Sequence, residues 1–279
     1  MRITLIACLM LIAFTASSFA AGVWVDTWNK GGYYATNGEK IGFNQLLGRS
    51  ETRVGINLVG QGSQEVFFIG PYAAAIIVAS QDSNYWTNNV ATGYGLRVMP
   101  FVAYQPRGWA DEWIKDVKLF GEVLELSFLK DESTAKTNKV PTTDKRFGLD
   151  LYHEWNQQTP DPAYPWVTVW TNLSYRTTDF YQYPDGFKTY RVSYEQRTGF
   201  YLPNKTIKPY LRTDFNIAGK PEPWLNNILV GPGIQVEPIA DQKLSFYLEM
   251  LSIIWYKEPD SSRPKSDIRF GVEYRLYQK

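Results

Sequence analysis

The sequence contains very few of the side chains that bind metals or form disulfides. It has one cysteine, Cys8, and one histidine, His153, among 279 residues. A single cysteine excludes a disulfide framework and a cysteine-based zinc site, and a single histidine excludes a paired-histidine metal site. The sequence therefore predicts no metal and no cofactor.

An excess of charge of one sign is also absent. The chain carries 29 basic and 28 acidic side chains, for a formal net charge of +1. Proteins that bind nucleic acid through phosphate contacts need a basic surface. The balance predicts no nucleic-acid partner.

Long hydrophobic runs are missing, apart from the amino terminus. The longest later candidate, residues 67–79, is interrupted by glycine and proline, and a spanning helix needs roughly 18 uninterrupted apolar residues. Arg2, the short apolar run of residues 3–14 and the small residues that follow are typical of a secretory signal peptide. We predict a signal peptide over residues 1–20 and one domain over residues 21–279.

Aromatic residues, by contrast, are abundant. The chain has 10 Trp, 19 Tyr and 15 Phe, yet its mean hydropathy is -0.32. Rings at a boundary between water and lipid, combined with a wet polar interior, would account for both values.

Apolar and polar residues alternate with a period of two along most of the chain. In residues 267–276 five apolar side chains alternate with four charged ones and a glycine. Further segments of this kind lie at or near residues 22–28, 53–58, 65–80, 93–98, 118–128, 146–152, 167–176, 190–200, 208–217, 228–238 and 243–250. The pattern predicts an all-β fold, a single antiparallel transmembrane outer-membrane β-barrel of about 12 strands.

The connections predict how this barrel is oriented. Short turns at residues 60–64, 203–206 and 238–242 are expected on the periplasmic side. Longer loops at 29–48, 129–143 and 257–266 are expected outside. Residues 101–117 predict a short amphipathic helix at the membrane surface.

A soluble sandwich or a lipocalin-like barrel would also alternate and be secreted. The number and length of the strands favour the membrane barrel. Rings near strand ends, expected to form two interfacial girdles, favour it as well. These rings belong to Tyr33, Tyr34, Tyr85, Trp86, Trp155, Tyr164, Trp166, Phe180, Tyr181, Tyr183, Trp224, Trp255 and Tyr256.

The polar face of the strands is predicted to line the lumen as the substrate pathway. The lumen-lining residues are Arg53, Arg97, Arg146, Asp150, Arg176, Arg191, Glu195, Arg197, Tyr210, Arg212, Asp214, Tyr247, Glu249, Arg269, Glu273 and Arg275. Such a lining forms either salt-bridge networks that plug the barrel or a wet pore with slight anion preference. Inward glycines, which remove bulk, favour the pore; relief of crowding where strands bend is the alternative explanation for them. Inward tyrosines and tryptophans either stack on sugar rings or fill volume.

Catalytic residues are not evident. His153 lies between Tyr152 and Glu154, is expected to point outward near a strand end, and has no serine two residues away. Nucleophilic catalysis needs an activated nucleophile with a base in reach. We predict that the protein is not an enzyme.

Five short glycine- and aromatic-rich segments resemble the carboxyl-terminal barrel of bacteriophage adsorption protein A and, more loosely, barrels that export exopolysaccharide. They are residues 94–101, 166–175, 198–200, 207–211 and 231–234. In that family the barrel follows a periplasmic array of helical repeats, which this sequence does not contain. The resemblance therefore implies a separate periplasmic scaffold or export protein as partner.

The favoured function is an outer-membrane pore for saccharide or other polar solutes, within an exopolysaccharide export system. The expected location is the outer membrane of a Gram-negative bacterium, with outer-membrane lipid as a partner. The alternative is a non-conducting structural or receptor barrel that binds phage or another partner through its long loops. A lipid-modifying enzyme is the third and least favoured hypothesis.

Overall fold

The computed structural model describes most of the chain. The described residues are 22–36, 45–58, 67–83, 85–137, 140–157, 161–178, 188–203, 206–219, 226–238, 243–257 and 265–278. The predicted signal peptide and Cys8 lie outside them. Within the described ranges, no helix has the length and apolar character needed to cross a membrane.

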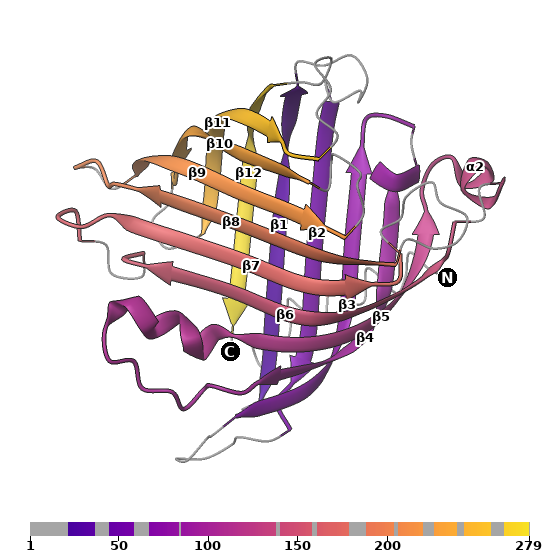
Figure 1. Cartoon of the computed structure of the whole chain (residues 1–279), viewed down its shortest axis with the longest axis horizontal. Helices are drawn as coiled ribbons and strands as arrows, with labels where there is room; N and C mark the ends of the chain where they lie inside the picture. The colour runs from indigo at the N-terminus through magenta and orange to yellow at the C-terminus, as the bar shows by residue number, and fades with distance from the viewer. Residues whose placement is uncertain are drawn as a thin grey trace.

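Twelve strands form a closed antiparallel barrel, as the period-two pattern predicts (Figure 1). They are β1 (Val23–Thr36), β2 (Gln45–Ile56), β3 (Phe68–Ser80), β4 (Asn89–Met99), β5 (Lys118–Phe128), β6 (Thr143–Trp155), β7 (Trp166–Arg176), β8 (Thr189–Gly199), β9 (Ile207–Ala218), β10 (Asn227–Val236), β11 (Leu244–Trp255) and β12 (Ser266–Gln278). Each strand pairs with the next, and β1 pairs with β12 to close the ring. In Figure 1, β6 to β9 cross in front of β1 and β2 and run in a different direction, so the strands are tilted around the ring.

The connections at the two ends of the barrel follow the prediction in part. We call the end where β1 begins and β12 ends the terminal end. The predicted loop at residues 29–48 is wrong, because β1 continues to Thr36 and β2 begins at Gln45. The predicted short turns at residues 60–64, 203–206 and 238–242 fall between strands that meet at the terminal end, and the predicted loops at 129–143 and 257–266 fall at the opposite end. The longest connection, residues 100–117, lies at the terminal end and is an exception to this division.

The polar composition of β1 and β2 explains the missed strands. Thr27 and Asn29 alternate with side chains that point inward, so polar residues occupy both faces of β1. On the outer face these side chains bond to one another: Thr27 Oγ1 lies 2.8 Å from Thr52 Oγ1, and Ser50 Oγ donates to Asn29 Oδ1 at 2.7 Å. Mutual hydrogen bonding satisfies polar groups that face away from the lumen.

The helix predicted within residues 101–117 is present as the 3₁₀ helix η3 (Trp109–Asp116). It packs on the outer face of β6, where Trp155 Nε1 donates to the carbonyl of Trp109 at 2.6 Å. His153 is buried beneath it, with Nδ1 2.5 Å from Asp116 Oδ2. The side chain of Trp109 is 73% exposed. The placement of η3 at a membrane surface stays a prediction.

Asp111 organises the start of η3. Its carboxylate accepts hydrogen bonds from the Tyr104 hydroxyl at 2.7 Å and from the backbone N–H groups of Arg107 and Gly108, each at 3.0 Å. The bond from Tyr104, followed by the backbone bonds, lowers the pKa of Asp111 below its ordinary value.

Two short helices lie at the opposite end of the barrel, η2 (Tyr85–Thr87) and α2 (Glu132–Thr137).

A belt of exposed apolar side chains covers the outer face of the strands. Its members include Tyr94, Leu96, Leu119, Phe147, Leu173, Tyr190, Leu211, Ile217, Ile234, Phe246, Leu248, Met250, Ile268, Phe270 and Val272. Outward rings pair across strands, for example Phe147 with Tyr175 at 5.2 Å between centroids and Tyr175 with Tyr190 at 5.1 Å. An apolar patch of this extent is unusual on a soluble surface and is the face that a membrane barrel presents to lipid.

The predicted aromatic girdles are confirmed only in part. Tyr164 and Tyr256 are exposed near strand ends. Tyr85 and Trp166 are instead fully buried, and Tyr34 lies under the guanidinium of Arg269, inside the barrel. The predicted Phe180, Tyr181, Tyr183 and Trp224, like the side chain of Trp86, lie outside the described residues. Sequence position near a strand end does not say to which face a ring points.

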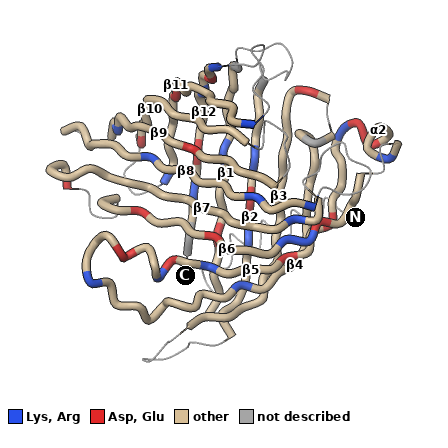
Figure 2. The backbone as a smooth tube through the Cα atoms, viewed as in Figure 1, with Lys and Arg blue, Asp and Glu red and all other residues tan. Residues whose placement is uncertain are grey.

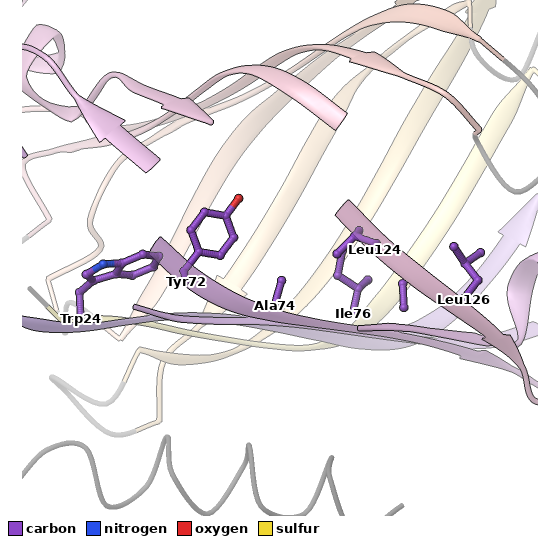
Figure 3. Packing of buried hydrophobic residues seen from close by; sticks show 7 residues of the cluster. Trp24, Tyr72, Ala74, Ile76, Leu124 and Leu126 are labelled. Atoms are coloured by element: carbon purple, nitrogen blue, oxygen red, sulfur yellow. The ribbon is translucent and has the colours of Figure 1, made fainter. Parts of the chain in front are cut away.

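Part of the inner face is apolar, contrary to a uniformly polar lining. Trp24, Tyr72, Ala74, Ile76, Ala91, Leu124 and Leu126 form one buried cluster. Figure 3 shows the labelled members rising from the strand ribbons to the same side, into the barrel. Side chains of β1 and of β3 to β5 therefore pack against one another on this part of the inner face.

The inward glycines relieve crowding more than they open the lumen. A Cβ at Gly93 or Gly148 would meet a backbone oxygen of the neighbouring strand at 1.9 or 2.0 Å. At Gly95 and Gly233 the space is filled by the rings of Tyr72 and Tyr210.

Replacing Gly271 by alanine should lower the unfolding free energy by about 1–3 kcal/mol, because overpacking forces the backbone to shift. The new Cβ would lie 2.1 Å from the carbonyl oxygen of Gly31. Gly31→Ala is the matched control, since nothing lies within 4 Å of a Cβ there, and it should change stability by less than about 0.5 kcal/mol. Urea unfolding in detergent micelles measures both; equal losses would contradict the steric argument.

Leu248→Arg tests whether the apolar belt faces lipid. Leu248 lies in the middle of β11 and is 46% exposed. Arginine on a lipid face near the bilayer midplane costs about 2–4 kcal/mol, whereas on a water-exposed surface it is neutral within about 0.5 kcal/mol. We expect the larger cost in phospholipid vesicles. The control is Leu129→Arg, at an exposed position beyond β5.

Candidate functional site

The sixteen predicted lumen residues all lie on the inner face of the barrel. Their strands alternate with outward positions such as Tyr190 and Phe270, which are exposed, and most of them contact residues of strands that are not their neighbours. In Figure 2 basic and acidic residues run along the strands as well as in the connections. Whether they form a substrate pathway stays a prediction.

Arg212 is the centre of a network on the inner face of β8, β9 and β11. Its guanidinium donates to Glu249, to Glu195 and to Asp214, in each case with a shortest distance of 2.8 Å. The Glu249 side chain is 0% exposed. A buried carboxylate of this kind is tolerated only with paired charge and saturated hydrogen bonding.

Arg197 extends this network toward β12. It pairs with Glu195 at 2.8 Å and with Glu273 at 2.9 Å. Tyr210 donates to Glu249 at 2.7 Å beneath the Arg197 guanidinium, which lies 5.7 Å from the ring centroid. Eight predicted lumen residues, namely Glu195, Arg197, Tyr210, Arg212, Asp214, Glu249, Arg269 and Glu273, belong to this wall. Tyr247 joins them through the Lys30 ammonium, 4.5 Å above its ring.

A second network is centred on Glu122, which sequence reasoning missed. Arg53 donates to this carboxylate at 3.2 Å, the Tyr72 hydroxyl donates at 3.0 Å, and Arg146 lies 3.6 Å from it. Arg146 also donates to Asp144. Glu122 has apolar neighbours at the same parity, including Leu124, so β5 shows no clean polar face in its sequence.

A third group crosses the lumen, and we call it the crossing layer. It consists of Trp28, Asp150, Tyr152, Trp170, Glu273 and Arg275. Arg275 on β12 places its guanidinium carbon 3.2 Å from the centroid of the Tyr152 ring on β6. Five strands separate β12 from β6 in either direction around the barrel, so this contact joins opposite walls.

The rest of the crossing layer follows from the strand register. Trp28 is the register partner of Arg275, and Trp170 is the register partner of Tyr152. Trp28 Nε1 donates to Glu273 and Trp170 Nε1 donates to Asp150, each at 3.0 Å. Four side chains from two opposite pairs of strands therefore lie at one level.

A nearby ion pair also bridges the barrel toward the terminal end. Lys118 on β5 lies 3.4 Å from Asp26 on β1, and Lys118 is the register partner of Asp150. Lys243, just before β11, lies 3.8 Å from Glu154 on β6. These two ion pairs therefore bridge the terminal half of the lumen.

The remaining predicted residues have other partners. Arg97 donates to Asn57 at 3.3 Å and lies 3.5 Å above the Trp24 ring. Arg176 donates to Ser174 at 3.1 Å. Arg191 on β8 is the register partner of Ser174 on β7. Sequence parity placed them on the correct face but not with these contacts.

Some inward charged side chains keep exposed surface. The side chains of Arg53 and Glu195 are 26% and 25% exposed, and that of Asp26 is 20% exposed. These residues point inward, so their exposed surface borders space within the barrel. Each network thus contains a buried carboxylate, Glu249 or Glu122, and a partly exposed charge, Glu195 or Arg53.

Within the described ranges no three histidine, cysteine or acidic side chains are grouped so as to hold a metal ion. His153, the one histidine, lies on the outer face beneath η3 and away from the lumen.

Comparison by sequence identifies no family model and no curated protein that matches the chain. Solved structures similar to it are membrane barrels. An outer-membrane channel from Pseudomonas putida F1 has a TM-score of 0.39 and 9% identity, over 94% of this chain and 97% of that one. The KdgM porin in complex with disordered oligogalacturonate has 0.36 and 8%, over 90% and 99%.

The transport unit of the autotransporter AIDA-I from Escherichia coli has a TM-score of 0.31 and 12% identity, over 98% and 97%. TM-scores this low carry no argument about function. The resemblance to the phage adsorption barrel is confirmed only as far as the barrel fold.

Arg212→Ala should lower the unfolding free energy by about 3–5 kcal/mol, because it leaves the buried Glu249 carboxylate without its principal cation. Arg49→Ala is the matched control: Arg49 also bonds to a carboxylate, Glu51, but its side chain is 42% exposed, and the expected cost is below about 1 kcal/mol. Urea titration of the folded barrel in micelles measures both. Similar losses for the two variants would contradict the burial argument.

Proposed function

We propose that the chain is an outer-membrane conduit for saccharide or other polar solutes, with its narrowest point at the crossing layer. The observation that carries this proposal is the combination of an apolar outer belt with inward charges that are partly hydrated, such as Arg53 and Glu195. A barrel with a lipid-facing exterior and a wet polar interior provides a path for solutes that lipid excludes.

The charge pattern favours polar solutes of low net charge. Inward Arg and Lys side chains are largely matched by Asp and Glu, as in the pairs Arg197–Glu273 and Lys118–Asp26. A wall with both signs offers hydrogen-bond donors and acceptors without a strong field. Neutral polyols meet such a wall at little electrostatic cost.

The predicted signal peptide supports placement in the outer membrane of a Gram-negative bacterium, with outer-membrane lipid around the belt. Coupling to a periplasmic scaffold or export protein, and export of polysaccharide in particular, follow from the family resemblance alone. We include them in the proposal as its finer part.

A non-conducting structural or receptor barrel is the second candidate. The contact between Arg275 and Tyr152 favours it, because side chains from opposite walls touch. In that case connections at the end opposite the terminal end would bind the partner. We do not favour an enzyme, since His153 lies outside the lumen beside Asp116.

Planar-bilayer recording of Arg275→Ala tests the conduit. The wild-type barrel should show a small conductance, and the variant a larger one with reduced anion preference, because a side chain that crosses the lumen and its positive charge are both removed. Tyr94→Ala is the control, since Tyr94 is 69% exposed on the outer face and its loss should leave conductance unchanged. A wild-type barrel that inserts and stays silent would transfer the proposal to the second candidate.

A further inference from the structure

Two tryptophans stand on opposite walls of the crossing layer. Trp28 lies on β1 and Trp170 on β7, with five strands between them on either side of the ring. Both side chains point inward and are partly exposed. They are linked across the lumen through Arg275 and Tyr152, each of which is the register partner of one tryptophan.

The two indole rings are each held by a hydrogen bond of the same kind. Each uses its N–H group to donate to an inward carboxylate at 3.0 Å, Trp28 to Glu273 and Trp170 to Asp150. A hydrogen bond in the ring plane fixes the ring edge and leaves the two ring faces free of this contact. A rigid aromatic plane beside a carboxylate is thus built twice, on facing walls.

The ring faces of the layer are not equally occupied. The Arg275 guanidinium covers Tyr152 at 3.2 Å, and the Arg49 guanidinium approaches Trp28 at 5.9 Å. Within the described part of the chain, no ring or cation stacks on Trp170. Among the described residues, Trp170 is therefore a crossing-layer ring with neither a cation nor another ring stacked on its faces.

The polar groups beside these faces retain capacity for further hydrogen bonds. Asp150 uses Oδ1 to accept from both Trp170 and Asn172, at 3.0 and 3.4 Å, which leaves its other oxygen as an acceptor. Arg275 supplies donors at the same level. A ligand with apolar faces and hydroxyl groups around its edge matches this arrangement, because its faces stack while its edge bonds to carboxylate and guanidinium.

We propose that the crossing layer is a saccharide subsite of the conduit, in which Trp170 and Trp28 stack on sugar rings and Asp150 and Glu273 accept from sugar hydroxyls. This inference rests on the proposed function and names its substrate class. Glu273 is paired with Arg197, and Arg275 lies near Asp150. Charges of both signs are therefore balanced at this level, and the expected solute is a neutral sugar.

The test measures block of the open channel by maltohexaose in planar bilayers. A polyethylene glycol of equal hydrodynamic radius serves as comparison, because it obstructs the lumen but has no sugar face. Wild-type protein should show saturable block by the sugar at lower concentration than by the polymer. Trp170→Ala should raise the half-blocking sugar concentration about threefold to tenfold, the effect of one lost aromatic stack.

Trp170→Phe is the matched variant, since it keeps an aromatic face and should retain most of the sugar block. Binding of maltohexaose to the folded barrel in micelles, measured by titration calorimetry, provides a readout that does not need conductance. Heat-modifiable gel migration confirms that each variant is folded.

The outcomes separate the subsite from the conduit. If the barrel conducts but sugar and polymer block alike, or if Trp170→Ala leaves sugar block and binding unchanged, the subsite is overturned and the conduit stands. If the barrel is silent but binds maltohexaose through Trp170, the conduit fails and the sugar site stands. A silent barrel that binds no sugar overturns both.

Discussion

The pairing of β1 with β12 is the constraint on which the rest of the molecule depends. Closure leaves no strand edge without a partner, so every backbone group within the twelve strands can bond inside the sheet. It also divides the side chains of each strand into an outer and an inner set. The apolar belt and the charged interior are two consequences of one closed ring.

Closure makes the interior a confined space in which charge must be balanced locally. Arg212 bonds to three carboxylates, and Glu249 on β11 is sealed beneath it. On β5, the buried carboxylate of Glu122 pairs with two cations, Arg53 and Arg146. Because breaking such a pair leaves an uncompensated buried charge, the two networks hold strands together that share no backbone hydrogen bonds.

The strands could be predicted from the sequence because most of them carry apolar side chains on the outer face and polar ones on the inner face. In β12 the alternation of Phe270 and Val272 with Arg269 and Glu273 is complete, so its position and its faces both followed from period two. The same reasoning failed for much of β1, where outward Asn29 is polar and satisfied by Ser50. Where polar groups satisfy one another on the outer face, the alternation disappears although the strand remains.

The sequence predicted on which face of the barrel each candidate site residue lies, but it did not predict which residues they contact. Parity placed Arg275 and Tyr152 inside, yet nothing in either segment indicates that they meet across the barrel. That contact depends on strand tilt and on the register of all the intervening strands, which are properties of the whole ring. Trp28 was missed for a related reason, since its role depends on Glu273, more than two hundred residues away in sequence.

The interior therefore contains two kinds of contact, the ion-pair networks of Arg212 and Glu122 and the contact of Arg275 with Tyr152 across the lumen. The Arg212 and Glu122 networks are multiply bonded around the buried carboxylates of Glu249 and Glu122, so they resist change. The contact of Arg275 with Tyr152 is of another kind, because a guanidinium on a ring face is held by one favourable surface, and acidic groups lie nearby on β1 and β6 that can receive it. The ion pairs Lys118–Asp26 and Lys243–Glu154 bridge the lumen as well. Passage through the proposed conduit would then require side-chain movement at more than one level, with no change in backbone pairing.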